Sequence, residues 1–346
     1  MAAVSADLVK RLARECGFEL AGVAAAGPSP DRGRYLEWVS RGMAGAMRYL
    51  TDHRAEARMD PRRLLPRARS VIVVGKLYNT AQPYSTEIDD PGRGWISRYA
   101  WGRDYHAVMR EGLERLAERL RSFADFEWKV CVDTAPLLER SYAREAGLGW
   151  IGKNTCLINQ QSGSWFFLGE LLTSLELAVD APPPDRCGTC SRCIDACPTQ
   201  AIVPDGAGGW SLDARLCISY FTIELKGPIP EEHRAAMGRH IFGCDICQDV
   251  CPWNRQAPSA PEPDFAPRHF APPLDQIALL SPEEFRRSYA GTAVTRTRYA
   301  GLLRNAAVAM GNSRASKFRQ PLENLANSAE EGVAEHAQWA LRRLEE

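Results

Sequence analysis

The spacing of the cysteines constrains this chain more than any other feature. Residues 187–198 read CGTCSRCIDACP, and residues 244–254 read CDICQDVCPWN. Thiolates are soft metal ligands, and a C-x2-C-x2-C-x3-C-P run is typical of [4Fe-4S] proteins in which the fourth cysteine binds a second cluster. The spacing therefore predicts a crossed module with two [4Fe-4S] clusters, as in bacterial ferredoxins.

Eight of the eleven cysteines complete this pattern. Since Cys217 is the lone cysteine between the two runs, it takes the place of the first cysteine of the second run. One cluster is assigned to Cys187, Cys190, Cys193 and Cys251, and the other to Cys197, Cys217, Cys244 and Cys247. Two four-cysteine zinc sites are the structural alternative, which both Cys-Pro endings disfavour. Cys16, Cys131 and Cys156 are expected to be ordinary buried thiols.

The region before the cysteines mixes helical and strand patterns. An apolar strand is expected at 70–78, an amphipathic helix at 104–123, a strand at 127–134 and a helix from Pro136 to Gly147. In the 127–134 strand, Trp128, Val130 and Val132 share one face, and Asp133 points to the other. Asp133 thus lies at a strand end before a helix, where α/β proteins often place chemistry.

Three units are predicted: a catalytic domain at 1–180, a ferredoxin-like domain at 181–262 and a C-terminal region at 263–346. APPPDR at 181–186 indicates a linker, and the six prolines of 256–273 indicate an extended strap. Residues 304–312 and 335–343 match at an offset of 31 residues. This match predicts a short pair of HEAT-like helical repeats, with a chance similarity of small residues as the alternative.

Charge and hydropathy give expectations about the cellular location of the protein and about its binding partners. The charged N-terminal segment lacks the apolar core of a signal peptide, and no apolar run is long enough to span a membrane, so a cytoplasmic monomer is expected. The formal net charge is +0, but residues 285–320 hold eight Arg or Lys and no acid. This segment predicts phosphate contacts with nucleic acid, led by Arg296 and Arg298. A solvated helix face is the alternative.

Two clusters usually relay single electrons, and the 180 residues before them imply a reaction centre. Motifs for a radical enzyme, a dinucleotide fold and a P-loop are absent. Asp104 and His106 begin the DxHxxG motif of some cobalamin proteins, but Met109 replaces its glycine. The motifs alone therefore leave the cofactor of the reaction centre unnamed.

Several stretches carry a resemblance to a known family. RGMAGAMRYL, ARMDPRRLLPRARSVI, RYAWGRDYH, VDTAPLLERSYAREAGLGWIGKNT and CDICQDVCPWN together resemble epoxyqueuosine reductases, collinearly from about residue 5 to 310. The resemblance implies an α+β, cobalamin-binding catalytic domain like that of reductive dehalogenases. It also implies reduction of epoxyqueuosine to queuosine in the anticodon loop of tRNA, with electrons from an external donor passing through the clusters to cobalamin.

Residue roles follow from the same resemblance. Asp133 is implied as the proton donor, and such a carboxyl would have to be shielded from water to keep its proton at pH 7. Lys226 is implied to lie near the tRNA. Cobalamin contacts are implied at Arg58, Ser97, Asp133, Leu157, Leu168, Ser219, Cys244 and Asp245. No histidine ligand to cobalt is expected.

Some alternatives stay open. Glu139 and Glu145 are expected to be surface or structural residues. The glycines of GLGWIGKN (147–154) either let backbone approach a flat macrocycle or form a plain turn. A corrinoid iron–sulfur reductase acting on a small molecule and a ferredoxin-like electron carrier with a binding domain are the competing functions.

Overall fold

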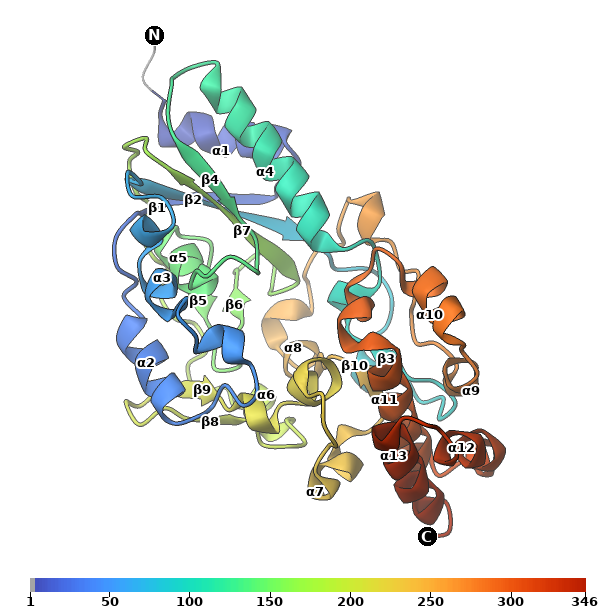
Figure 1. Ribbon diagram of the computed structural model, residues 1–346. Helices are drawn as coiled ribbons and strands as arrows, with labels where there is room; N and C mark the ends of the chain where they lie inside the picture. Colours follow the sequence, from blue (N-terminus) through green and yellow to red (C-terminus); the bar gives the residue numbers. More distant parts are fainter. Residues whose placement is uncertain (1–3) are drawn as a thin grey trace.

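The centre of the N-terminal region is a four-stranded antiparallel sheet. The computed structural model describes residues 4–346, and the sheet has the strand order β1-β2-β7-β4 (Figure 1). Its strands are β1 (Leu20–Ala25), β2 (Ser70–Leu77), β7 (Phe166–Thr173) and β4 (Trp128–Cys131). Every residue of β2 is buried, as expected for an apolar central strand.

Helices cover both faces of the sheet. The helices α1 (Ala6–Glu15) and α4 (Tyr105–Arg121) pack on one face, and α5 (Glu139–Glu145) packs on the other (Figure 1). Val130 and Val132 join the apolar cluster under α1 and α4, whereas Cys131 joins the cluster under α5. The predicted division of the faces of β4 is therefore confirmed, and the fold is a mixture of helix and sheet.

The sequence misplaced the boundaries around Asp133. The strand β4 ends at Cys131, and α5 begins at Glu139 rather than at Pro136. Between them Asp133 has a φ of 48°, in the left-handed region that residues other than glycine rarely adopt. Tight turns follow it, with the Leu137 amide donating to the Ala135 carbonyl at 2.8 Å. These turns leave no room for a helix to begin at Pro136.

The remaining elements before the cysteines are short. Two small pairs of strands flank the sheet: β5 pairs antiparallel with β6, and β3 pairs parallel with the later strand β10. The bounds are α2 (Arg32–Ser40), α3 (Ala55–Met59), β3 (Trp95–Ile96), β5 (Trp150–Ile151), β6 (Leu157–Ile158) and β10 (His240–Phe242). A Cβ at Gly149 would lie 2.2 Å from the Ile158 carbonyl oxygen, so this glycine is needed to close the β5-β6 hairpin. This contact explains Gly149, and the two interpretations of GLGWIGKN both stay open.

The cysteine-rich segment is built from short elements. Its helices and strands are α6 (Arg192–Asp195), β8 (Ile202–Pro204), β9 (Trp210–Leu212), η6 (Tyr220–Glu224), α7 (Glu231–Arg234) and α8 (Ile246–Asp249). The element η6 is a π-helix that begins three residues after Cys217. The predicted proline strap follows, and its only regular element among the described residues is the single turn η9 (Pro263–Phe265).

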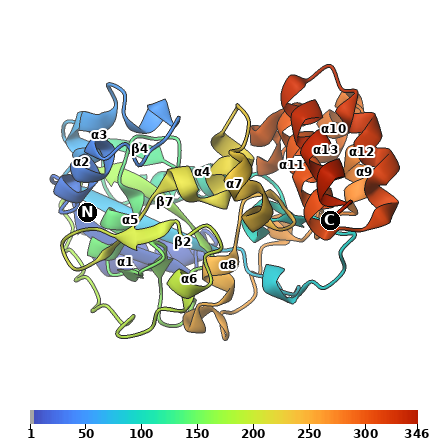
Figure 2. The ribbon, with the colours of Figure 1, turned by 90° about the horizontal axis from the view of Figure 1, so that it is seen from below.

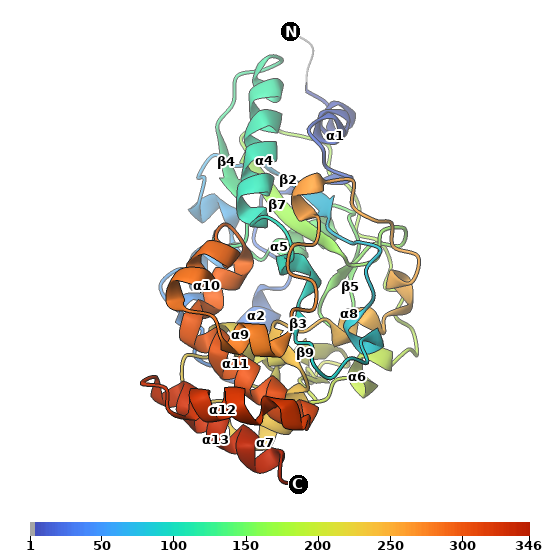
Figure 3. The same cartoon turned by 90° about the vertical axis from the view of Figure 1, so that its right-hand side faces the viewer.

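The C-terminal region is entirely helical. It comprises α9 (Leu274–Ala278), α10 (Pro282–Tyr289), η10 (Ala293–Thr297), α11 (Arg298–Ser313), α12 (Arg319–Ala326) and α13 (Glu331–Arg343). These helices gather at the end of the molecule opposite the sheet (Figures 2 and 3). The two matching segments lie in α11 and α13, which pack together, and their status as HEAT-like repeats stays a prediction. No helix in residues 4–346 has the length and apolarity of a membrane span.

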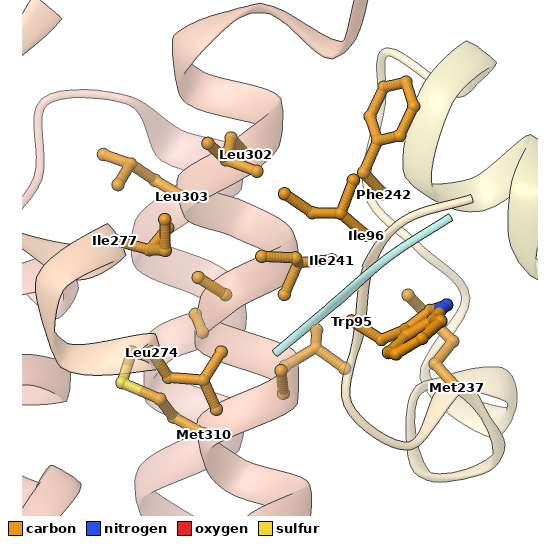
Figure 4. Packing of buried hydrophobic residues seen from close by; sticks show 14 of the residues in the cluster. Trp95, Ile96, Met237, Ile241, Phe242, Leu274, Ile277, Leu302, Leu303 and Met310 are labelled. Atoms are coloured by element: carbon orange, nitrogen blue, oxygen red, sulfur yellow. The ribbon is translucent and has the colours of Figure 1, made fainter. Parts of the chain in front are cut away.

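One apolar core joins parts of the chain that are far apart in sequence. Figure 4 shows Ile96 of β3 and Ile241 of β10 beside Leu302 and Met310 of α11. The side chain of Asn305 crosslinks the same region by donating to the carbonyls of Thr222 and Ile241, both at 2.8 Å. This core, the inter-region core below, contains residues from all three predicted units, whose boundaries stay a prediction.

Candidate active site

Asp133 lies where the sheet, α4 and the C-terminal region meet. Its backbone N–H donates to the Glu139 carboxylate at 2.6 Å, which holds the turn between β4 and α5. Its own carboxylate contacts His106 Nε2 at 3.1 Å and Arg296 Nη1 at 3.7 Å. The fold thus brings Asp133 together with two residues that are distant in sequence: His106 lies 27 positions before it and Arg296 lies 163 positions after it.

His106 is held on its other side by Asp104. The Asp104 carboxylate oxygen Oδ1 accepts from the His106 amide at 3.0 Å, which caps the start of α4, and contacts His106 Nδ1 at 2.6 Å. The imidazole stacks on Tyr105, whose ring stacks in turn on Phe167 with 4.2 Å between ring centroids. Both ring nitrogens of His106 therefore face carboxylates.

The protonation of this group differs from the sequence expectation. Burial raises the pKa of Asp133, but the hydrogen bond and charge of His106, with the charge of Arg296, outweigh it and leave the pKa below its usual value. Burial lowers the pKa of His106, but its hydrogen bonds to Asp104 and Asp133 raise it to about 9. The Asp133 side chain is 38% exposed. Because the pKa of His106 is raised to about 9 and that of Asp133 is lowered, the proton is expected on His106 at pH 7.

Two more carboxyls lie behind Asp133. Glu170, in the central strand β7, is fully buried, and neither of its carboxyl oxygens has a hydrogen-bond partner within residues 4–346. Burial and the nearby Glu139 raise the pKa of Glu170 well above its usual range. Burial, then the charge of Asp133, raises the pKa of Glu139 to about 7. Glu139 thus lies at the site and holds the turn of Asp133, which agrees with the expected structural role, whereas the alternative of a surface residue is wrong.

Asp133 lines two neighbouring cavities. One has a volume of about 670 Å³ and contains Arg58, and the other has a volume of about 570 Å³ and contains Leu168. Both cavities are lined by Asp133, Thr134, Glu139, Arg140 and Arg296. Volumes of this size suit organic ligands. Asp133 can therefore meet two bound groups at once.

The residues implied as cobalamin contacts fall into two sets. Arg58, Leu168 and Asp133 line the cavities, whereas Asp245 is buried and accepts hydrogen bonds from the Arg98 amide at 2.7 Å and from Trp95 Nε1 at 3.2 Å. Within residues 4–346, Arg58 Nε and Ser97 Oγ are buried without a hydrogen-bond partner. Leu157 is buried in β6, and Ser219 and Cys244 are partly buried.

The first predicted cysteine quartet surrounds a cavity. Cys187, Cys190, Cys193 and Cys251 all line a space of about 340 Å³. Lys153 fastens one side of it by donating to the carbonyls of Gly188 at 2.7 Å and Cys190 at 3.0 Å.

The four cysteines of the second predicted quartet also lie near one another. Burial is the main cause of the raised pKa of Cys217 and of Cys244, and nearby thiols add to it: Cys197 acts on Cys217, and Cys217 and Cys197 act on Cys244. For Cys247, a hydrogen bond with Cys156 is the main cause of a raised pKa, and Cys217 and Cys244 add to it. Both quartets are therefore grouped as the spacing predicted, and the assignment of each ligand stays a prediction.

The three remaining cysteines do not behave alike. Cys16 and Cys131 are buried in the two apolar clusters of the sheet domain, as expected. Cys156 is only partly buried and lies beside Cys247. The expectation of an ordinary buried thiol is thus wrong for Cys156.

The basic residues of the C-terminal segment have different surroundings. Arg298 and Lys226 are exposed, but Arg296 binds Glu224 at 2.7 Å and Tyr49 at 3.1 Å in the cavity wall. Arg304 is 4% exposed and donates to the backbone carbonyls of Leu225 and Gly227, both at 2.7 Å. Arg304 therefore stabilises the fold, and the charge pattern alone could not separate it from the exposed cations.

Sequence reasoning missed three members of the site. His106 was noticed only as part of an incomplete cobalamin motif, although Asp-x-His at a helix start could have indicated a capped, carboxylate-bound imidazole. Glu170 interrupts an otherwise apolar strand, FFLGELLT, which is a usable signal of a functional carboxyl. Nothing in the sequence indicated that Arg296 would contact Asp133.

Comparisons with known proteins agree with this arrangement. A model described as a 4Fe-4S double cluster binding domain matches residues 186–254, and one described as Epoxyqueuosine reductase QueG, DUF1730, matches residues 58–134. The chain is 42% identical over 344 residues to the epoxyqueuosine reductase of Xanthomonas campestris, covering 97% of this chain and 95% of the relative. For the Escherichia coli enzyme the identity is 41% over 312 residues, covering 89% and 81%.

Solved structures give the same result. A crystal structure of epoxyqueuosine reductase with an epoxyqueuosine-modified tRNA stem loop matches with a TM-score of 0.88 and 28% identity, over 98% of this chain and 90% of that chain. The Bacillus subtilis enzyme, solved with its catalytic aspartate loop swung out of the active site, matches with a TM-score of 0.86, 28% identity and the same coverage. With its sequence, its cysteine module and its fold all matched, the chain belongs to the epoxyqueuosine reductase family of oxidoreductases.

Proposed function

We propose that this enzyme reduces epoxyqueuosine to queuosine in the anticodon loop of tRNA, with Asp133 as the proton donor. The single observation that carries the proposal is the position of Asp133 in the shared wall of two cavities. The two adjoining cavities can together hold the cofactor and the modified base. From this position Asp133 can pass a proton to the substrate while the cofactor passes electrons to the substrate.

The two cysteine quartets support the supply of electrons. We assign one [4Fe-4S] cluster to Cys187, Cys190, Cys193 and Cys251, and the other to Cys197, Cys217, Cys244 and Cys247. The second quartet is proposed to lie nearer to the cofactor. Cys244 follows β10, which pairs with β3, and β3 is followed by the proposed cobalamin contact Ser97. The first quartet lines an open cavity where an external one-electron donor can deliver electrons.

The residues present fit cobalamin in two respects. Arg58 Nε and Ser97 Oγ are buried polar atoms without a hydrogen-bond partner in the described chain, and a polar ligand would satisfy them. Leu168, Tyr105 and Phe167 line an apolar, partly aromatic wall in the smaller cavity. Cobalamin, when bound, supplies a cobalt centre able to combine two electrons at the substrate. Ser219, Leu157, Cys244 and Asp245 are proposed to complete its surroundings.

Recognition of tRNA is proposed for the exposed cations near this site. One structural relative was solved with an epoxyqueuosine-modified tRNA stem loop, and this chain matches it over 98% of its length. Lys226 and Arg298 are exposed and can bind phosphates, and Arg296 extends from the surface to Asp133. An enzyme must expose its target base to act on it, so the base would enter a cavity beside Arg296.

Other parts of the proposal concern organisation. We infer a cytoplasmic monomer, consistent with the absence of a membrane-spanning helix in the described residues. The division at 1–180, 181–262 and 263–346 is proposed as a functional one: catalysis, electron transfer and a helical unit with HEAT-like repeats. The inter-region core holds the three together.

The experiment is a single-turnover reaction with tRNA that carries epoxyqueuosine. Asp133→Asn keeps the shape of the side chain but cannot donate the proton, so the rate should fall by ~10² to 10⁴. Binding of tRNA and the iron and cobalamin contents should match the wild type, because other residues hold these groups. Asp7→Asn, an exposed position on α1, is the matched control and should react at the wild-type rate.

Equal single-turnover rates for wild type and Asp133→Asn, at equal iron and cobalamin content, would place the proton donor elsewhere. Failure of the wild-type enzyme to form queuosine under these conditions would contradict the proposed reaction itself.

A further inference from the structure

His106 lies between two carboxylates, and this geometry determines its charge. Its Nδ1 is 2.6 Å from Asp104 Oδ1, and its Nε2 is 3.1 Å from Asp133 Oδ2. A neutral imidazole carries one N–H and can donate to only one of them, whereas the imidazolium donates to both. The position between two acceptors therefore favours the protonated ring.

The surroundings contain no other group within hydrogen-bond distance of the ring among the described residues. Tyr105 stacks on the imidazole at 4.2 Å, which fixes the plane of the ring. The other charged or titratable groups that face the pair are Arg296 from η10, Glu139 from α5 and Tyr99 from the turn after β3. Arg296 Nη1 lies 3.7 Å from Asp133 Oδ2, the same oxygen that His106 Nε2 contacts at 3.1 Å, so Arg296 adds positive charge beside the carboxylate while His106 keeps the shorter contact.

We propose that His106 stores the proton that Asp133 delivers to the leaving oxygen of the substrate, and that Asp104 positions the ring for this transfer. The inference deepens the proposed function and rests on it. His106 does not touch the substrate in this scheme. It is a positioning and proton-storing residue that acts through Asp133.

The proton transfer balances as follows. As a C–O bond of the epoxide breaks, the Nε2 proton of His106 passes to the Asp133 carboxylate, and Asp133 passes it on to the oxygen. His106 becomes neutral and then recovers a proton from solvent. The complete reaction consumes two electrons from the external donor and two protons, breaks both C–O bonds, forms a C=C bond and releases water.

The titration of the two groups agrees with this assignment. The pKa of His106 is raised to about 9 and that of Asp133 is lowered, so the pair holds one proton at neutral pH, and it is on the imidazole. An isolated Asp133 with a lowered pKa would be a poor acid at pH 7. The neighbouring imidazolium can supply the proton, because it donates to the carboxylate the proton that Asp133 then passes to the oxygen.

The first test measures the proton on His106 directly. The chain has six histidines, so side-chain NMR of histidine-labelled, cluster-loaded protein is tractable, and His106→Gln identifies the signal. The His106 signal should titrate near pH 9 and should move towards its ordinary value of about 6.5 in Asp104→Asn and in Asp133→Asn. Titration near 6.5 in the wild type would overturn the inference.

The second test uses the pH dependence of the single-turnover rate. The wild-type rate should be constant from neutral pH up to about pH 9 and fall above it, as His106 loses its proton. In His106→Gln the amide can still donate to Asp133, but the transferable proton must reside on Asp133 itself. The rate at pH 7 should therefore fall by roughly 10-fold to 10²-fold, and the loss of rate should begin at a lower pH.

A purely structural role for His106 predicts a different result. His106→Gln would then keep the pH dependence of the wild type, and that outcome would overturn the inference. If the single-turnover rate falls in Asp133→Asn but not in His106→Gln, only the proton-storing role of His106 is contradicted. An unimpaired Asp133→Asn would contradict the proton donor of the proposed function.

Discussion

The electron-handling and proton-handling parts of this enzyme are built in different ways. The two cysteine quartets lie on short helices and loops between residues 187 and 251. The proton-handling group lies at the edge of a packed sheet and combines Asp133 with His106 of α4 and Arg296 of η10. The first part depends on local spacing, and the second depends on the tertiary fold.

This difference determines what a substitution should do in each part. Removing a thiolate leaves a cluster short of one ligand, whatever the surrounding fold does. Removing the carboxyl of Asp133 or Glu139 changes the titration of its neighbours, because the charge of Asp133 raises the pKa of Glu139 and the charges of Glu139 and Asp133 raise the pKa of Glu170. We therefore expect sharp, separate effects in the first part and linked effects in the second.

The largest effect is expected for Cys217→Ala. The second cluster would lose a ligand, so iron should fall from about eight to about four per chain, and turnover should be lost with it. The first quartet and the binding of tRNA should be unaffected. Iron analysis and single-turnover kinetics check this, with Cys156→Ala as the matched control because Cys156 lies beside Cys247 but outside both quartets. Eight iron atoms in Cys217→Ala would contradict the ligand assignment.

A smaller, pH-dependent effect is expected for Glu170→Gln. The folded-state pKa of Glu170 is raised, so its contribution to stability is fully present below about pH 4.5 and is lost as the pH rises. Above that pH, the free energy of unfolding of the wild type should fall by up to about 1.4 kcal/mol per pH unit more than that of Glu170→Gln. Denaturation of cluster-loaded protein at pH 5, 6 and 7 measures the difference.

Glu118→Gln is the control for that experiment, since Glu118 is an exposed carboxylate on α4. Its stability should follow the pH dependence of the wild type. Parallel curves for the wild type and Glu170→Gln would show that Glu170 is not protonated in the folded enzyme, and the linkage assumed for the proton-handling group would fail.

The smallest effect is expected at the surface. Arg298→Ala should weaken tRNA binding and reduce the slope of log affinity against log salt by up to about one, as for one lost phosphate contact. Cluster content and the His106 titration should not change. Binding measured at several salt concentrations checks this, with Arg121→Ala at the far end of α4 as the control. An unchanged slope would assign Arg298 to a solvated face.

The comparison also explains what could be predicted from the sequence. Cysteine spacing indicated both quartets, and the two-residue period of 128–132 indicated the faces of β4, because both patterns act over a few residues. The left-handed backbone of Asp133, its contact with Arg296 and the burial of Arg304 arise from segments distant in sequence. Periodicity and composition carry no information about such contacts, so the charged partners of Asp133 could not be foreseen.

The inter-region core has a consequence for how the enzyme can transmit force. Ile96 and Ile241, which precede Ser97 and Cys244 in the chain, are packed against Leu302 of α11. A rigid seam of side chains, rather than a flexible tether, therefore separates the helical end from the redox end. Since β3 ends one residue before Ser97 and β10 ends two residues before Cys244, we expect a displacement of α11 on docking of a nucleic acid to pass through packed side chains to the backbone that leads into both residues.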